Sequence, residues 1–312
     1  MRWIDTIHDL TPVEIVDGMT FKRDDKFAPL GYGDINGAKL RQAIWLVDGW
    51  VKRGVKGIVS GSVSQSPQHA FISEICKHYR IGCVITHSKK KIEEKDSPYL
   101  FRAKRLGAKM LYSKVGYAKT LGALARKTLK LLPDHEFLET NITLEDNVNT
   151  WEEIEAFHSV GAEQVRNIPS SVNRLVIPCG SCNSSTSILY GLLKYPKPNL
   201  KEIILMGIGN HGSNNIEYIE HRLKHISATK GIDTEGVYDW SFEGLKGFRH
   251  SMRYENLNGT GYCQYSDTFH EKAGSIYFHP RYEGKCIRYF RQRMKEHWNE
   301  KTLFWIVGSD IR

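Results

Sequence analysis

Short apolar runs alternate with amphipathic stretches along much of the chain. Apolar runs at residues 57–60, 83–86 and 109–112 have the length and composition of buried strands. Helical periodicity separates them, at residues 69–79 and 99–106. Strands that alternate with helices at this spacing are joined by crossovers and form parallel sheets. The pattern predicts an α/β protein with parallel, twisted sheets flanked by helices.

The same alternation returns in the second half of the chain. Residues 174–178 and 202–206 are strand-like, and a helical pattern follows each of them. The two halves are separated at residues 167–171, a polar stretch that contains a proline. We therefore expect a boundary between two structural parts near this position.

Composition narrows the class of protein. Hydrophobic residues make up 40% of the 312 residues and charged residues 25%, as in an ordinary globular protein. Apolar runs fall short of the roughly 18 residues that a membrane helix needs, and acidic Asp5 and Asp9 stand where a signal peptide would be apolar. Six scattered cysteines are too few for a disulfide scaffold. We expect a cytoplasmic protein without a membrane partner.

The formal net charge of +9 is unevenly distributed. The segment from Lys77 to Lys130 holds fifteen lysines and arginines against three acidic residues, whereas residues 134–163 hold nine acidic residues and neither lysine nor arginine. Cations on amphipathic helices are commonly a solvated face. Cations clustered without acids also create a field that attracts a polyanion. The basic segment therefore indicates either a solvated face or a nucleic-acid-binding surface.

Two glycine-rich loops have the outline of nucleotide-binding motifs. Residues 207–212 read G-x-G-x-x-G between a strand and a helix, but no acidic residue follows at the spacing of a dinucleotide site. Residues 31–40 resemble a P-loop superficially. There, Ala38 separates the last glycine from Lys39, and no serine or threonine follows the lysine. Neither loop predicts a nucleotide cofactor with any strength.

A third loop, residues 178–186 (P-C-G-S-C-N-S-S-T), runs from a strand into a helix. Small and hydroxyl-bearing residues dominate it, so backbone N–H and hydroxyl groups can converge on an anion at the start of the helix. Cys179 and Cys182 form a single C-x-x-C without a second pair, so we expect no metal. The loop predicts a phosphate site made by Gly180, Ser181, Cys182, Asn183, Ser184 and Ser185.

Two neighbouring segments near the start of the chain carry a family resemblance. Residues 21–25 read F-K-R-D-D and residues 36–41 read N-G-A-K-L-R. Together they resemble the start of fold type II pyridoxal-phosphate (PLP) enzymes, the tryptophan synthase β superfamily. The closest likeness is to the 1-aminocyclopropane-1-carboxylate (ACC) deaminase and D-cysteine desulfhydrase family. In that family the lysine of the second segment forms the Schiff base with the cofactor, a role that the resemblance gives to Lys39.

Later motifs follow in the family's order over nearly the whole chain. Residues 60–69 match the family's Ser-Asn-His loop, with Ser66 at its serine, Pro67 at its asparagine and Gln68 at its histidine. The phosphate loop matches a G-S-G-G-T segment. Gly261 and Tyr262 resemble the segment of the active-site tyrosine.

The final motif, residues 279–285 (H-P-R-Y-E-G-K), resembles a D-P-x-Y-x-G-K stretch near the C-terminus of the family. From the resemblance we expect PLP as cofactor and Lys39, Ser66 and Tyr262 as catalytic residues. Lys39 and the phosphate loop would hold the cofactor, while Ser64, Ser66 and Gln68 would contact the substrate.

The resemblance also implies a domain organisation. A larger PLP-binding domain would combine residues 1–46 and 166–312, and a smaller α/β domain, residues 47–165, would carry the basic segment. The cofactor would lie in the cleft between the two domains. We expect the protein to form a homodimer.

The expected activity is that of a PLP-dependent lyase, of the deaminase or desulfhydrase type, acting on an amino acid through a carbanion at Cα. A second hypothesis keeps the cofactor but places the amino acid on a base of DNA. The reaction would then be a decarboxylation or an elimination, as in viral DNA hypermodification, with nucleic acid bound by the basic segment. A third hypothesis is a degenerate, non-catalytic fold that binds nucleic acid.

Overall fold

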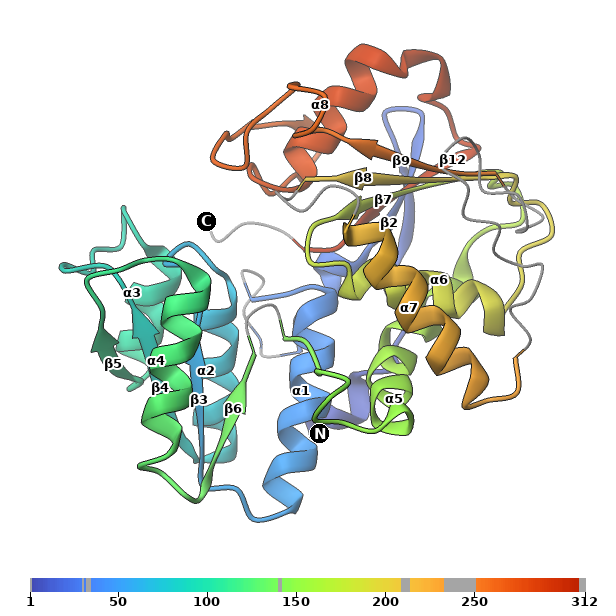
Figure 1. Cartoon of the computed structure of the whole chain (residues 1–312). Helices are drawn as coiled ribbons and strands as arrows, with labels where there is room; N and C mark the ends of the chain where they lie inside the picture. Colours follow the sequence, from blue (N-terminus) through green and yellow to red (C-terminus); the bar gives the residue numbers. More distant parts are fainter. Residues whose placement is uncertain are drawn as a thin grey trace.

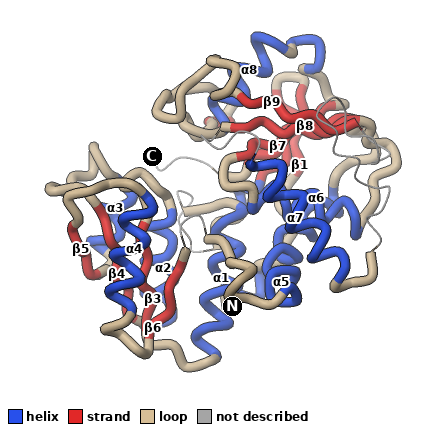
Figure 2. Tube along the Cα trace, viewed as in Figure 1, coloured by secondary structure: helices blue, strands red, loops and turns tan. Residues whose placement is uncertain are grey.

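The structure, a computed structural model, describes residues 2–29, 31, 35–139, 142–208, 214–232 and 251–308. Figures 1 and 2 show two groups of strands, each covered by helices, with the long helix α1 (Ala38–Lys52) between them. Within the described ranges the strands form a six-stranded sheet, a four-stranded sheet and a two-stranded hairpin, β10 (Lys272–Ala273) with β11 (Ile276–Tyr277). The α/β class with helix-flanked parallel sheets is confirmed.

The four-stranded sheet is wholly parallel. Its strands in spatial order are β5 (Lys109–Tyr112), β4 (Gly82–His87), β3 (Gly57–Gly61) and β6 (His135–Leu138). The helices that connect these strands are α2 (Gln68–Tyr79), α3 (Pro98–Arg105) and α4 (Ala118–Leu129). Because all four strands run the same way, the loops that follow them gather at one end of this smaller sheet.

The six-stranded sheet is parallel except at one edge, where β1 pairs antiparallel with β2. Its spatial order is β1 (Val13–Val16), β2 (Met19–Arg23), β12 (Thr302–Ile306), β7 (Arg174–Cys179), β8 (Glu202–Gly207) and β9 (Ser251–Asn256). The last strand of the chain is thus inserted between β2 and β7. This order brings together the ends of segments that are far apart in the sequence.

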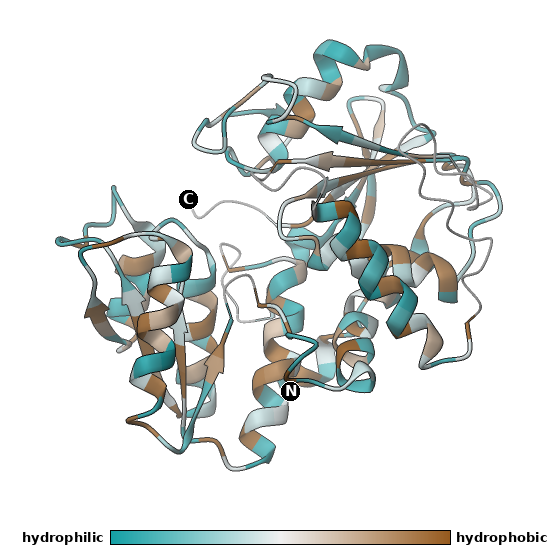
Figure 3. Ribbon diagram, viewed as in Figure 1, coloured by the Kyte–Doolittle hydropathy of each residue, from teal (hydrophilic) through white to brown (hydrophobic). Residues whose placement is uncertain are grey.

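The larger sheet is buried on both faces. Leu175 and Ile177 of β7 belong to the core shared with α1, α5 (Trp151–Ala162), α6 (Asn183–Lys194) and α7 (Asn214–Ala228). Val176 between them faces the opposite core, which contains α8 (Glu283–Arg293). Figure 1 shows α8 on one side of the sheet and α6 and α7 on the other, and Figure 3 shows the hydrophobic colour of the central strands. Strands buried on both faces read as continuous apolar runs.

Most of the elements expected from the apolar pattern are confirmed. β3, β4, β5, β7 and β8 cover the strand-like runs, and α2 and α3 cover the helical stretches between them. The domain boundaries remain a prediction. Helix α5 falls within residues 47–165, the range expected for the smaller domain, and it packs against α1 and α6. No helix in the described ranges is long and apolar enough to span a membrane.

The F-K-R-D-D segment that carries part of the family resemblance is a buried support. The Lys22 ammonium donates to the carbonyl of Thr11 (2.8 Å). Asp24 accepts a hydrogen bond from the indole of Trp305 on β12 (2.8 Å) and lies 3.8 Å from the guanidinium of Arg41 on α1. A buried ion pair that is also hydrogen-bonded fixes relative orientation. The segment therefore fixes the start of α1 against the larger sheet.

Candidate active site

The candidate site lies at the carboxyl ends of three neighbouring parallel strands, β2, β12 and β7. Helix α1 follows β2, and α6 follows β7 directly. In open α/β sheets, the free N–H groups at such helix starts face the crevice where ligands bind. The topology thus brings Lys39 and the predicted phosphate loop to the same edge of the sheet.

Lys39 is the second residue of α1. Burial lowers the pKa of its amine from 10.5 to about 8, while the negative charges that Cys182 and Glu283 can carry act in the opposite direction. A lysine with this pKa is partly neutral near pH 8, and the neutral amine is the form that attacks an aldehyde carbon. The position and the electrostatics of Lys39 both suit the role expected for it.

The backbone of a single residue, Val307 just after β12, connects Lys39 to Glu283. The Val307 carbonyl accepts a hydrogen bond from the N–H of Ala38 (2.9 Å), the residue before Lys39. The Val307 N–H donates to Oε1 of Glu283 (3.2 Å), the first residue of α8. The backbone of Val307 therefore holds the start of α1, with Lys39, at a fixed separation from Glu283 at the start of α8.

Gly37 permits this close approach. It adopts φ 98° and ψ 178°, a conformation that is essentially restricted to glycine. A Cβ atom at position 37 would lie 2.3 Å from the Val307 carbonyl oxygen. We expect Gly37→Ala to lower the free energy of unfolding by about 2 kcal/mol or more, because backbone strain and this contact both oppose the folded state. The midpoint of urea denaturation measures the effect.

Gly122, in the interior of α4, provides the matched control. A Cβ atom there meets nothing within 4 Å, and its backbone is helical. Gly122→Ala is expected to raise the free energy of unfolding by about 0.5–1 kcal/mol through the helix propensity of alanine. Equal effects of the two substitutions would contradict the role given to Gly37.

Glu283 was not singled out from the sequence. Its side chain is 1% exposed, and its Oε2 has no hydrogen-bond partner among the described residues. Burial raises the pKa of this carboxyl from 4.5 to about 8. A buried carboxyl with one unpaired oxygen suits a ligand that carries a proton or a positive charge. The signal in the sequence was the acid that follows tyrosine in the H-P-R-Y-E-G-K segment.

The predicted phosphate loop leads into α6. Cys182 adopts φ 65°, in the left-handed region that favours glycine, so it takes the backbone conformation of the glycine that it replaces. The side chain of Asn183 turns away and donates to the Ile142 carbonyl (2.9 Å) and to Thr143 Oγ1 (3.1 Å). The Asn183 side chain therefore connects the start of α6 to the segment that follows β6.

Hydroxyl groups line the first turn of α6. Ser185 and Thr186 are buried, and Oγ1 of Thr186 has no hydrogen-bond partner within the described ranges. Ser185 lies beside the Cys179 thiol, whose Sγ is 3.6 Å from that of Cys182. This turn supplies a helix N-terminus and buried hydroxyl groups, which are the donors that a phosphate requires.

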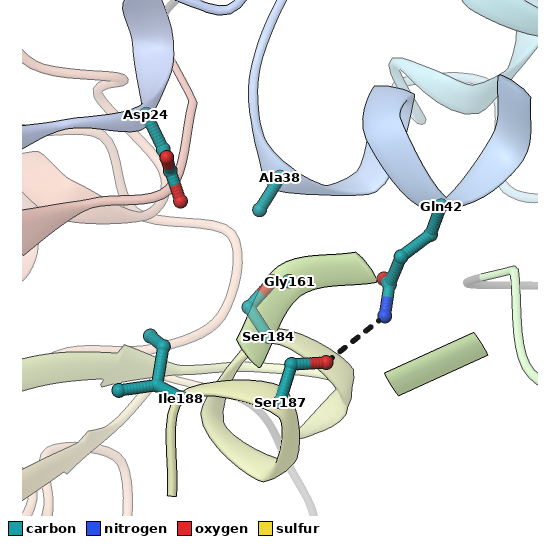
Figure 4. Close-up of a pocket in the computed structure, with 7 residues that line it drawn as sticks. All are labelled: Asp24, Ala38, Gln42, Gly161, Ser184, Ser187 and Ile188. Carbon is teal, nitrogen blue, oxygen red and sulfur yellow. Dashed lines mark hydrogen bonds between the residues drawn. The ribbon is translucent and has the colours of Figure 1, made fainter. Parts of the chain in front are cut away.

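A small cavity beside these two helix starts is shown in Figure 4. Gln42 of α1 donates to Ser187 of α6 across it (3.1 Å). Ala38, next to Lys39, and Ser184 of the predicted phosphate loop line the same cavity, so the starts of α1 and α6 are direct neighbours. Its lining consists of Asp24, Ala38, Gln42, Gly161, Ser184, Ser187 and Ile188.

The three residues predicted to contact substrate lie at the carboxyl end of β3 and the start of α2. Ser66 is half-buried, and its hydroxyl lies 3.4 Å from the N–H of Gln68. The Gln68 side-chain amide donates to Ser60 Oγ and to the Glu139 carbonyl, each at 2.9 Å. The Ser64 hydroxyl lies 3.3 Å from that of Ser88. Ser66 and Ser64 are thus at the sheet end, while the Gln68 amide joins β3 to β6.

Tyr262 lies apart from this group. Its hydroxyl donates to Gln292 (2.8 Å), nine residues after Glu283 on α8. Nine residues of α-helix span about 14 Å. The structure therefore does not bring Tyr262 together with Glu283 at the start of α8.

Tyr282 is the tyrosine adjacent to Glu283. Its ring packs on that of His279 with 4.4 Å between centroids, and His279 Nε2 lies 3.3 Å from the hydroxyl of Tyr99 on α3. Tyr99 lies on α3, which connects strands of the smaller sheet, whereas Tyr282 directly precedes α8, which packs on the larger sheet. Tyr99, His279 and Tyr282 therefore connect the helices of the two sheets. Burial raises the pKa of Tyr282, which favours its neutral, proton-donating form.

The two glycine-rich loops and the possible metal ligands add little to the description of the candidate site. Residues 209–212 of the G-x-G-x-x-G segment and residues 32–34 of the P-loop-like segment lie outside the described residues. Among the described side chains, no group of three or more histidine, cysteine, aspartate or glutamate residues could hold a metal ion.

The donor set fits PLP. The cofactor presents an aldehyde, a pyridine nitrogen and a phosphate. The site offers one matching group for each: the low-pKa amine of Lys39, the unpaired oxygen of Glu283, and the hydroxyl-lined start of α6.

Solved structures share this fold. An ACC deaminase homologue matches with a TM-score of 0.67 and 12% identity over 98% of this chain and 94% of its own. Threonine deaminase isoform 2 from Solanum lycopersicum has a TM-score of 0.56 and 13% identity, over 99% and 83%. Escherichia coli diaminopropionate ammonia lyase, in complex with an aminoacrylate–PLP azomethine intermediate, has a TM-score of 0.58 and 13% identity, over 99% of this chain and 88% of its own. These proteins have the fold type II architecture of PLP enzymes.

No family model matches the chain. A sequence relative does: the O-seryl-dTMP PLP-dependent decarboxylase of Salmonella phage ViI is 33% identical in an alignment that covers 99% of this chain and 84% of the relative. The chain therefore belongs to the same family as this enzyme, within the fold type II PLP-dependent enzymes. It is a PLP-dependent enzyme of the lyase type, as the sequence predicted.

Proposed function

We propose that the protein removes the α-carboxylate of an amino acid carried on a thymidine nucleotide, using PLP held by Lys39. The observation that carries this proposal is the 33% identity, over 99% of the chain, to a phage enzyme named as an O-seryl-dTMP decarboxylase. The fold neighbours, named as a homologue of ACC deaminase, a threonine deaminase and a diaminopropionate ammonia lyase, are 12–13% identical. The phage relative therefore weighs more for substrate and reaction than these neighbours do.

The residues described above would divide the work. When bound, PLP withdraws electrons from Cα of an amino acid, which stabilises the carbanion left by bond cleavage. Lys39 would hold the cofactor, and its amine, once released, can return a proton to Cα. Glu283 would accept a hydrogen bond from the pyridine nitrogen through its unpaired Oε2. The start of α6 would hold the phosphate.

The loop that carries Ser64, Ser66 and Gln68, which we call the substrate loop, supports decarboxylation. Pro67 occupies a position next to Ser66 and, lacking an N–H, removes one possible donor to a carboxylate. The Gln68 amide, engaged with Ser60 and Glu139, is also directed elsewhere. A carboxylate that receives few hydrogen bonds loses CO2 more readily, because charge leaves it in the transition state. Ser66 and Ser64 would orient the substrate's α-carboxylate rather than neutralise its charge.

Product analysis tests the proposal. The purified, PLP-loaded enzyme is incubated with O-seryl-dTMP in deuterated water, and the nucleotide is recovered for mass spectrometry. Decarboxylation breaks the Cα–carboxylate bond, releases CO2 and adds one solvent proton to Cα. We expect a product lighter by CO2 that carries one deuterium on carbon.

Other reactions leave different products. Elimination across Cα and Cβ, which is the redox-neutral route to deamination, would leave two different products: the nucleotide without its amino acid, and pyruvate with ammonia from hydrolysis of the released aminoacrylate. Either product, formed in place of the decarboxylated nucleotide, would contradict the proposal. Free serine serves as the comparison substrate: turnover of serine with O-seryl-dTMP left unchanged would favour a small-amino-acid lyase instead.

We also infer that the protein acts in the cytoplasm and forms a homodimer. All six cysteines are free thiols, including two pairs close enough to interact, which suits a reducing compartment. Light scattering of the purified protein at two concentrations checks the dimer, and a mass corresponding to a single chain at both would contradict it.

A further inference from the structure

The substrate loop continues into a surface formed by the next two loops of the smaller sheet. Ser64 is 3.3 Å from Ser88, hydroxyl to hydroxyl, and Ser88 in turn packs so closely on Gly116 that a Cβ atom there would lie 2.7 Å from the Ser88 hydroxyl. Gln65 also donates to the Asp96 carbonyl (2.8 Å). Because β3, β4 and β5 are parallel, these loops lie at one end of the sheet, the upper end in Figure 1.

Four unpaired cations lie on this surface. Lys89, Lys90, Lys114 and Lys119 form no ion pair with a carboxylate in the part of the chain that the structure describes. Their acidic neighbour Glu93 is engaged by Lys91 and lies 3.8 Å from Lys95. Elsewhere in the basic segment, Arg102 pairs with Glu74, and Arg126 with Glu139 and Glu145. Other cations of the segment also have no carboxylate partner among the described residues: Lys77, Arg80, Lys104, Arg105, Lys109, Lys127 and Lys130. What distinguishes the four lysines named first is their position on the loops that adjoin the substrate loop, or directly after them.

Exposed aromatic side chains lie among these cations. Tyr117, between Lys114 and Lys119 in the sequence, is 77% exposed, and Tyr112 at the end of β5 is 49% exposed. Large side chains that remain in water are available for contact with a partner. Cations that neutralise phosphates, combined with aromatic rings on which bases stack, are the features of single-strand binding surfaces. We call this surface the basic strip: Lys89, Lys90, Tyr112, Lys114, Tyr117 and Lys119.

We propose that the basic strip binds the DNA strand that carries the substrate nucleotide, so that the enzyme acts on polymeric DNA. This inference rests on the proposed function and extends it from a nucleotide to a strand. An enzyme that reacts at a group on a base must take that nucleotide out of the duplex stack. The strip would hold the flanking phosphates with its lysines and receive a neighbouring base on Tyr117. Affinity would then depend on salt and little on base sequence.

Fluorescence anisotropy tests the strip. The PLP-loaded enzyme is titrated against a fluorescently labelled, unmodified single-stranded DNA oligonucleotide at several salt concentrations. We expect the combined substitutions Lys89→Gln, Lys90→Gln and Lys114→Gln to weaken binding at low salt by about tenfold or more. The slope of log affinity against log salt should fall by about 2, because each lost phosphate contact to a single strand contributes about 0.7.

A matched triple variant controls for overall charge. Lys201→Gln, Lys224→Gln and Lys301→Gln remove the same charge from exposed positions of the larger part of the molecule. This control is expected to bind DNA nearly as wild type does. Tyr117→Ala should weaken binding about tenfold without changing the salt slope, and Tyr117→Phe should restore it, because stacking needs the ring and not the hydroxyl.

Three outcomes would contradict the proposal that the basic strip binds DNA. They are a wild-type enzyme that does not bind DNA at low salt, equal losses of DNA affinity in the two triple variants, and an unchanged DNA affinity of the Tyr117→Ala variant. The proposed function is tested separately by turnover of the mononucleotide. Decarboxylation of O-seryl-dTMP without DNA binding would refute DNA binding by the strip and would still support the proposed function. Strip-dependent DNA binding without decarboxylation of either O-seryl-dTMP or an oligonucleotide that carries the same seryl group would support DNA binding by the strip and refute the proposed function.

Discussion

Lys39→Ala is expected to abolish covalent attachment of PLP and to lower kcat by at least about a thousandfold, because the nucleophilic amine and a proton carrier are both lost. In the wild type the pKa of about 8 leaves about half of the Lys39 amines neutral at pH 8, against about 0.3% for an ordinary lysine. The rate of attachment should therefore rise with pH up to about 8 and then level off. Absorbance of the bound cofactor and borohydride reduction measure attachment.

Lys22 provides an internal control for this experiment. Burial also lowers the pKa of its amine to about 8, but the amine donates to the Thr11 carbonyl (2.8 Å) and to Oδ1 of Asn167 (2.7 Å). A reactive pKa alone would make both lysines candidates, whereas the geometry assigns the reaction to Lys39. Peptide mapping after borohydride reduction should find the cofactor on Lys39. Cofactor on Lys22, or retained in Lys39→Ala, would contradict the assignment.

Glu283→Gln is expected to weaken PLP binding and to lower kcat by about a hundredfold or more. Glutamine preserves the shape of the side chain and can still accept the hydrogen bond from the Val307 N–H. It cannot carry the negative charge that would stabilise a protonated pyridine nitrogen. Spectroscopic titration with PLP measures the affinity, and steady-state kinetics measure kcat. Glu296→Gln, at an exposed site, is the control and should match the wild type.

The same variant has a stability signature in the cofactor-free protein. The folded-state pKa of Glu283, about 8, lies above its ordinary value of 4.5, so wild-type protein loses stability as the pH rises from 4.5 through 8. Glutamine does not titrate, so the variant should gain stability relative to wild type over this range, on the order of 4 kcal/mol at most. Thermal unfolding from pH 5 to 9 measures the difference. A difference independent of pH would contradict the buried, unpaired state of Glu283.

The apolar pattern predicts the strands and helices that are buried on every side, such as β3, β7 and β8. It does not predict β2, in which Lys22 and Arg23 are fully or nearly buried. Such a strand reads as polar, because its charges are satisfied by partners that the apolar pattern does not identify: Asn167, far along the chain, for Lys22, and the nearby Asp25 and Glu14 for Arg23. The position of β12 between β2 and β7 is likewise a tertiary property, since those three strands are separated by more than a hundred residues.

The residues of the candidate site likewise divide into those that the local sequence predicts and those that depend on tertiary structure. Lys39 and the phosphate loop were predicted from local motifs, and the structure brings the starts of α1 and α6 together. Glu283 requires knowledge of burial and of an unpaired oxygen, which no spacing rule supplies. Tyr262 shows the converse: its local motif resembles an active-site segment, yet its hydroxyl contacts Gln292 on α8.

The backbone of Val307 fixes the position of Lys39 relative to Glu283 independently of the side chain at position 307. Both of its hydrogen bonds, to the Ala38 N–H and to Glu283, use main-chain atoms of residue 307. Almost any residue can therefore occupy this position during evolution without moving Lys39 relative to Glu283, and proline, which lacks the N–H, is the clear exception. Architecture held in this way can persist while sequences diverge to the 12–13% identity that separates this chain from its fold neighbours.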